Sequence, residues 1–306
     1  MTSLVLSTIL PIILLIALGV ALKARGFVSD SYWQGAERIG YYVLLPALFF
    51  NSLATADLSD VPIKEMAWVL LISTLFSGLV LYILRKRVTQ DGPAFTSVFQ
   101  GGVRFNNFIG VTIAAGLYGN SGIAMAAVAN AIIVPTVNIL CVLVFAKCAN
   151  TKSSIKSVAR SIATNPLLLS CVLGTLFHLG GLSLPDFLAP AVKSLGQAAP
   201  PLGLLCVGAA LSVKSLQLHI HPIAVSSVFK FLIMPVAAYA ICRIAGFNGH
   251  AAIVAVIFQA LPTASSSYVM ARQLGGDARL MANIVAVQTL FAGIALPVVI
   301  SVALAL

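Results

Sequence analysis

The sequence has few charged residues, which excludes an ordinary soluble protein. Only 8% of its 306 residues are charged, whereas soluble domains carry about 25%. Hydrophobic residues make up 60% of the chain, and the mean hydropathy is +1.04. Because about 20 apolar residues cross a bilayer, we expect an all-α polytopic membrane protein with about ten transmembrane helices. They run from 3 to 22, 36 to 55, 65 to 84, 95 to 117, 121 to 146, 161 to 180, 192 to 212, 222 to 243, 250 to 271 and 281 to 304.

The predicted spans also lack the residues of familiar catalytic and metal sites. All eight acidic residues lie in loops or at span ends, and no HExxH or GxSxG motif occurs. The five cysteines have no CxxC spacing, which argues against a metal or disulfide framework. We therefore expect neither an enzyme nor a cofactor. The stretch MTSLVLSTIL has no basic region, so we expect no removable signal peptide.

The basic residues are present but lie unevenly over the predicted loops. Thirteen lysines and arginines fall in loops on one side of the membrane and three on the other. The positive-inside rule places the thirteen inside, so both termini are expected on the outer side of a cell membrane. The net charge of +10 is thus explained by the basic loops on the inner side of the membrane. We therefore do not expect nucleic acid as a partner.

Proline, glycine and methionine recur at one offset along the chain, which indicates an internal repeat. A repeat of about 155 residues holds five spans, and an odd number requires the second copy to have the opposite orientation. We therefore predict two inverted five-helix repeats, residues 1–150 and 151–306. In such proteins the binding site lies near the midplane, where discontinuous helices meet. The matching pairs are Pro11 and Pro166, Gly19 and Gly174, Pro46 and Pro201, Gly119 and Gly275, and Met125 and Met281.

The fourth and ninth spans contain residues that interrupt helices. Span 4 contains GGVRFNNFIG (101–110), and span 9 contains FQALPTASSS (258–267). Pro262 removes a backbone donor, while Gly and Asn are weak helix formers, so both helices should break. A helix that restarts after a break presents N–H groups and the positive end of its dipole to an anion. Four residues could cap these restarts or donate to a carboxylate: Asn106, Asn107, Thr263 and Ser265.

Two basic residues, Arg104 and Lys230, fall inside spans, where a charge costs at least about 2.5 to 3.5 kcal/mol. An anionic substrate would offset that cost. Alternatively, Lys230 snorkels to the inner end of its span, and Arg104 braces carbonyls freed by the break.

Each of the remaining polar residues within spans has two possible roles. Asn165 precedes Pro166 as a helix N-cap would, or it binds substrate. The others line a pathway or bond between helices: Asn51, Asn130, Asn138, Gln259, Asn283 and Gln288.

Five strings, in order over essentially the whole chain, resemble the auxin efflux carrier family, which contains bacterial relatives of the plant auxin transporters. They are YYVLLPALFFNSLA, RFNNFIGVTIAAGLYGN, NPLLLSCVLG, FKFLIMP and QALPTASSSYVMARQLGGD. Two features differ from the plant members: the long cytoplasmic loop is missing, and RFNN stands where span 4 would carry a proline.

The resemblance implies crossed helices 4 and 9, a fold like that of bile acid transporters, and a homodimer in the bacterial inner membrane. It implies a scaffold of helices 1, 2, 6 and 7 and a transport unit of helices 3–5 and 8–10. The family's carboxylate-binding asparagines correspond to Asn106 or Asn107 and to Asn165. We therefore expect an efflux carrier for a small organic anion, a mono- or dicarboxylate, that works by alternating access. A sodium-coupled importer and a membrane sensor without transport are the alternatives.

Overall fold

A computed structural model describes residues 2–55, 61–149, 160, 163–211 and 220–306, and these residues form helices and their connections, without a β-strand. Five helical stretches are long and apolar enough to cross a membrane: Ser7–Ala24, Ile63–Ile83, Gly92–Cys148, Ile220–Ala245 and Ala278–Ala303. Pro166–Leu179 and His250–Gln259 are shorter apolar helices. The prediction of an all-α, multi-pass membrane protein is confirmed, while ten spans in inverted repeats stay a prediction.

The chain forms two compact units, each assembled from three separate segments. Unit 1 contains Met1–Ile63, Phe108–Ala131 and Ser161–Ala210, and unit 2 contains Lys64–Asn107, Ile132–Arg160 and Leu211–Leu306. The long helix α7 (Asn107–Cys148) contributes to both units. The predicted grouping into a scaffold and a transport unit stays a prediction.

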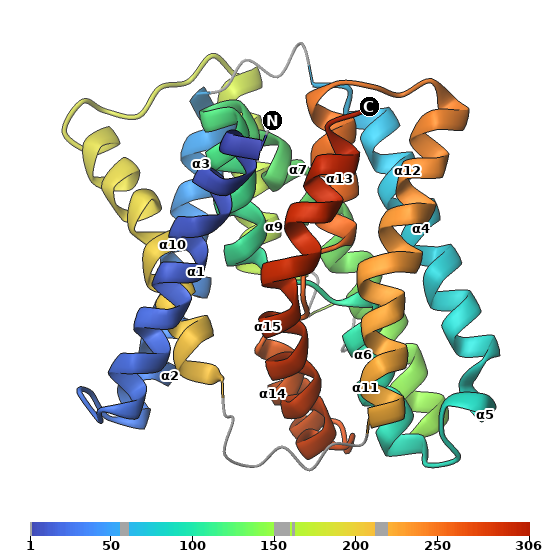
Figure 1. Ribbon diagram of the computed structural model, residues 1–306. Coiled ribbons are helices and arrows are strands. Elements are labelled where there is room, and N and C mark those ends of the chain that lie inside the picture. Colours follow the sequence, from blue (N-terminus) through green and yellow to red (C-terminus); the bar gives the residue numbers. More distant parts are fainter. Residues whose placement is uncertain (1, 56–60, 150–159, 161–162, 212–219) are drawn as a thin grey trace. The chain divides into compact units, whose positions relative to one another are not determined.

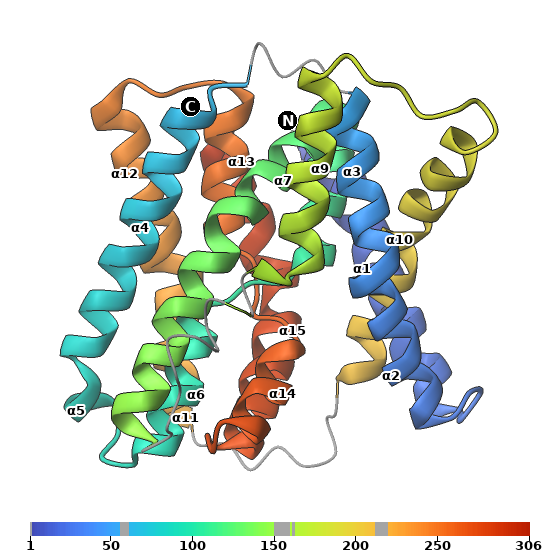
Figure 2. The ribbon, with the colours of Figure 1, turned by 180° about the vertical axis from the view of Figure 1, so that it is seen from behind.

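Unit 1 is built from paired helices that approach closely at glycines. Helix α3 packs along α9, and α1 packs along α10 (Figures 1 and 2). A Cβ at Gly208 of α10 would collide with the backbone carbonyl of Ile16, and one at Gly19 of α1 would collide with that of Leu205. The elements are α1 (Thr2–Ala24), α2 (Asp30–Ile39), the π-helix η1 (Gly40–Leu44), α3 (Leu45–Thr55), α9 (Pro166–Leu179) and α10 (Ala189–Ala210).

Unit 2 is organised around α6, which packs against α11, α14 and α15 (Figure 1). Asp91 begins α6 by accepting a hydrogen bond from Ala94 N, and Asp277 begins α15 by accepting one from Leu280 N, as N-cap residues do. The elements are α4 (Ile63–Ile83), α5 (Arg85–Val88), α6 (Gly92–Val103), α11 (Ile220–Val228), the π-helix η2 (Phe229–Ile233), α12 (Met234–Ala245), α13 (His250–Gln259), α14 (Ser266–Gln273) and α15 (Ala278–Ala303).

The two predicted helix breaks are present. Helix α6 ends at Val103 and α7 begins at Asn107, while α13 ends at Gln259 and α14 begins at Ser266. A further kink lies within α7 at Gly119, whose φ is 57°, and Gly275 after α14 has a φ of 70°. Both glycines adopt the left-handed backbone that other residues avoid. They are one of the pairs that define the predicted repeat.

Candidate functional site

The two broken helices meet at their breaks, within unit 2. The backbone N–H of Asn106 donates to the carbonyl of Pro262 at 2.8 Å. These two residues stand 156 positions apart, close to the offset of the repeat. Helix α7 begins directly after Asn106, and α14 begins four residues after Pro262. Two helices therefore start beside this single contact, which we call the crossing.

Gln288, from α15, joins the two breaks with its side-chain amide. Its Nε2 donates to the carbonyl of Gly101 at 3.0 Å and to Ser226 Oγ at 3.5 Å, and its Oε1 accepts from Thr263 N at 3.0 Å. The side chain is fully buried. Backbone groups freed by a break within a membrane must find partners in the protein. Gln288 supplies one such partner to each break.

Arg104 reaches from the first break to the helix that follows the second. Its Nη2 donates to Ser266 Oγ at 3.2 Å, and its Nη1 lies 2.9 Å from Asn138 Oδ1 and 3.6 Å from Met270 Sδ. These partners are side chains, so the alternative that Arg104 braces freed carbonyls is not what the structure shows. None of the three carries a negative charge. The buried Nε of Arg104 has no partner among the described residues.

The start of α14 adds further donors beside Arg104. The first N–H groups of a helix have no acceptor within it, and those of Ser265 and Ser266 have none among the described residues. Ser265 is half-buried and Ser266 is exposed. Thr263 is instead turned inward, where its hydroxyl lies 3.1 Å from Ser267 Oγ.

The charge at the crossing is positive. A helix N-terminus carries about half a positive charge, Arg104 adds a full one, and residues 101–110 and 259–267 contain no acid. Asn107 also lies here, and its buried Oδ1 has no partner among the described residues. This oxygen is an acceptor and would repel a carboxylate, so only the Nδ2 of the same amide can donate to an anion. The arrangement suits a small anion with several acceptor oxygens.

Two other predicted site residues belong to unit 1. Asn165 caps α9, because its Oδ1 accepts from Leu167 N at 2.9 Å and from Leu168 N at 3.2 Å. The N-cap prediction is confirmed, and the same amide donates to Tyr41 OH at 3.2 Å. Asn51 is half-buried in α3.

The last two predicted site residues, Gln259 and Lys230, lie in unit 2, but their side chains contact residues outside the crossing. Gln259 is fully buried, and its amide donates to Leu70 O, Ser73 Oγ and Thr74 Oγ1 of α4 at 3.1, 2.8 and 2.9 Å. Lys230 lies on η2 with no exposed surface, and its Nζ approaches Met234 Sδ at 3.7 Å. The snorkelling alternative for Lys230 is therefore wrong. Its side chain turns into the protein, and η2 packs against α6 and α15.

A comparison with protein families decides what kind of protein this is. The family model described as "Membrane transport protein" matches residues 4–300. The chain belongs to this family. It is the auxin efflux carrier family that the sequence strings indicated, so the protein is a membrane transporter and not an enzyme.

Relatives in the membrane transport protein family cover most of the chain. An "Uncharacterized transporter" of Methanothermobacter thermautotrophicus is 26% identical over 95% of both chains. One of Methanocaldococcus jannaschii is 22% identical over 94% of both. A "Putative malonate transporter" of Rhizobium meliloti is 26% identical over 78% of this chain and 88% of its own.

Proposed function

We propose that this protein is a secondary transporter that exports a small organic anion, a mono- or dicarboxylate, by alternating access at the crossing. One observation carries the proposal: Arg104 and the start of α14 present a guanidinium and free N–H groups at a helix break with no acid in its sequence. Malonate is the first substrate to test, since one relative bears that name.

Each residue at the crossing has a separate part in the proposed binding. Arg104 pairs with a carboxylate, and the N–H groups of Ser265 and Ser266 donate to its oxygens. The amides of Asn106 and Asn107 bind the remainder of the anion. Lys230, buried on the helix that packs against α6, raises the positive potential of this part of unit 2.

The proposal extends to the architecture around the crossing. It includes ten transmembrane helices in two inverted repeats, a scaffold of helices 1, 2, 6 and 7, and a homodimer in the inner membrane. The spacing of the paired prolines and glycines supports the repeat. The positive φ of both Gly119 and Gly275 agrees with it.

Thermal unfolding of the purified protein with ligands tests the proposal. A ligand at 100 times its Kd stabilises a protein by about 2.7 kcal/mol, so malonate should raise the unfolding temperature, while the uncharged diamide of malonate should not. Repeating the series with and without sodium shows whether sodium is coupled.

Variants then assign the effect to the crossing. Arg104→Gln should weaken malonate binding by about 10- to 100-fold, as expected for the loss of a charged hydrogen bond. Arg104→Lys should retain part of the affinity. The matched control is Arg272→Gln, which removes the same charge from the far end of α14, where Arg272 lies 5.9 Å from the Tyr268 ring. Equal losses from both glutamine variants would contradict the proposed site.

A further inference from the structure

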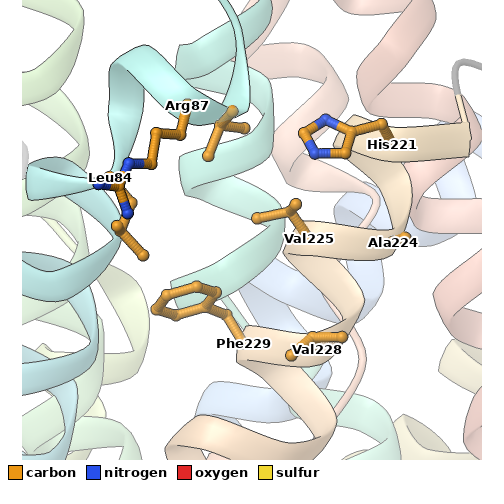
Figure 3. A pocket seen from close by; sticks show the side chains of 8 residues that line it. Leu84, Arg87, His221, Ala224, Val225, Val228 and Phe229 are labelled. Atoms are coloured by element: carbon orange, nitrogen blue, oxygen red, sulfur yellow. The ribbon is translucent and has the colours of Figure 1, made fainter.

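A groove at one end of unit 2 combines an apolar floor with two basic side chains. It has a volume of about 410 Å³ and lies between α11 and the segment from the end of α4 through α5 (Figure 3). Figure 3 shows Arg87 and His221 on opposite walls of this groove, with the side chain of Arg87 turned toward Leu84. The other lining residues are all apolar: Leu84, Val88, Ala224, Val225, Val228 and Phe229.

The groove is long enough to hold part of one acyl chain of a lipid. From His221 to Phe229 the helix advances eight residues, which is about 12 Å at 1.5 Å per residue. Phe229 closes the far end, where the lining carries no polar side chain. A ligand that matches this distribution has a charged head at Arg87 and an apolar tail of about 12 Å.

The charges at this end of unit 2 select an anionic head. Arg87 has no acidic partner among the described residues, and three more cations lie close by. Arg85 lies 4.5 Å and Lys147 lies 5.8 Å from the Tyr82 ring, and Lys86 follows Arg85 in the sequence. The positive-inside rule assigns this basic end to the cytoplasmic leaflet, which is rich in anionic lipids.

A second groove on the other side of α11 shows that the cations are specific to the first. It has a volume of about 720 Å³ and shares Ala224 and Val228 with the first groove. Its lining, which includes Phe291 and Val298 of α15, contains no charged residue. The second groove thus has no charged side chain to meet a head group, whereas the first has Arg87 and His221.

We propose that the first groove binds an anionic phospholipid of the inner leaflet. Its phosphate lies on Arg87 and His221, and one acyl chain follows α11 to Phe229. Phe229 also packs beside α6, because a Cβ built on Gly102 would lie 3.5 Å from Phe229 Cβ. Gly102 stands two residues before Arg104, so the bound chain supports α6 close to its break.

Native mass spectrometry of the detergent-purified full chain tests this proposal. Phosphatidylglycerol and phosphatidylcholine with identical acyl chains are titrated separately, and the wild type should bind more phosphatidylglycerol. Arg87→Gln should weaken phosphatidylglycerol binding by about fivefold, as expected for one basic contact near a membrane surface. Lys86→Gln is the matched control, because it removes the same charge from the same short helix without lining the groove. Val225→Trp should weaken binding of both lipids by filling the apolar floor.

Three results would overturn the assignment. Equal binding of the two lipids would show that the net negative charge of the head group plays no part. Equal losses in Arg87→Gln and Lys86→Gln would reduce the effect to general surface charge. Inorganic phosphate that displaces phosphatidylglycerol in the low millimolar range would show a phosphate site without a chain. The readout is lipid binding, so it does not depend on the transported anion.

Discussion

Replacement of Gln288 by leucine tests whether the crossing depends on one amide. The variant keeps a similar volume but removes the donor to Gly101 O and the acceptor for Thr263 N, both at 3.0 Å. Because these positions are buried, water does not replace the lost partners. Two backbone groups, one at each break, lose their hydrogen bonds at once.

The expected loss follows from the two bonds. Hydrogen bonds in a helical membrane protein contribute about 0.6 kcal/mol on average and up to about 1.7 kcal/mol. Two of them are worth about 1.2 to 3.4 kcal/mol, which corresponds to a fall of about 2 to 7 °C in unfolding temperature at about 2 °C per kcal/mol. Thermal unfolding in detergent measures this fall, and malonate binding should weaken in parallel because the crossing is less ordered.

The neighbouring residue provides the control. Thr289 is also buried, but its hydroxyl donates to the carbonyl of Val285 within its own helix, at 2.8 Å. Thr289→Val should therefore lower the unfolding temperature less than Gln288→Leu does. If the two variants are equally stable and bind malonate equally well, Gln288 does not hold the breaks together.

Three further substitutions test other parts of the structure. Asn165→Ala should lower the free energy of unfolding by about 1 kcal/mol through loss of the cap, whereas Asn165→Ser keeps an uncharged acceptor for the first N–H groups of α9 and should lose less; similar losses in both would refute the capping role. Gly208→Ala should cost about 1 to 3 kcal/mol, because the new Cβ collides with the Ile16 carbonyl, and a wild-type melting curve would contradict that close approach. Lys230→Met should raise the unfolding temperature by removing a buried amine and should weaken malonate binding by lowering the local potential, so unchanged binding would exclude Lys230 from the transport step.

The features that the sequence predicted depend on local chemistry. Pro262 lacks an N–H, and around it the chain forms no helix between the end of α13 at Gln259 and the start of α14 at Ser266. Asn165 directly precedes a proline, and it caps α9. In both places a few neighbouring residues decide the conformation, whatever the rest of the chain does. The scarcity of charge likewise indicated a membrane protein from composition alone.

The features that the sequence left open depend on partners far along the chain. Arg104 meets Asn138 and Ser266, which stand 34 and 162 residues away. From the sequence, Gln288 was one of six polar residues that line a pathway or bond between helices. Only the packing of α15 against α6 shows that Gln288 bonds the break. The distance of Lys230 from its span end says how far it is from water but not which way its side chain turns. That direction depends on neighbouring helices.

The contact between Asn106 and Pro262 uses only main-chain atoms. Changing the side chain at position 106 to alanine or serine therefore leaves this link intact, and only a proline there would delete it. In Asn106→Ala the junction of the two interrupted helices therefore persists, and a loss of transport would be traced to the contacts of the side chain, with the ligand or with its neighbours in the protein.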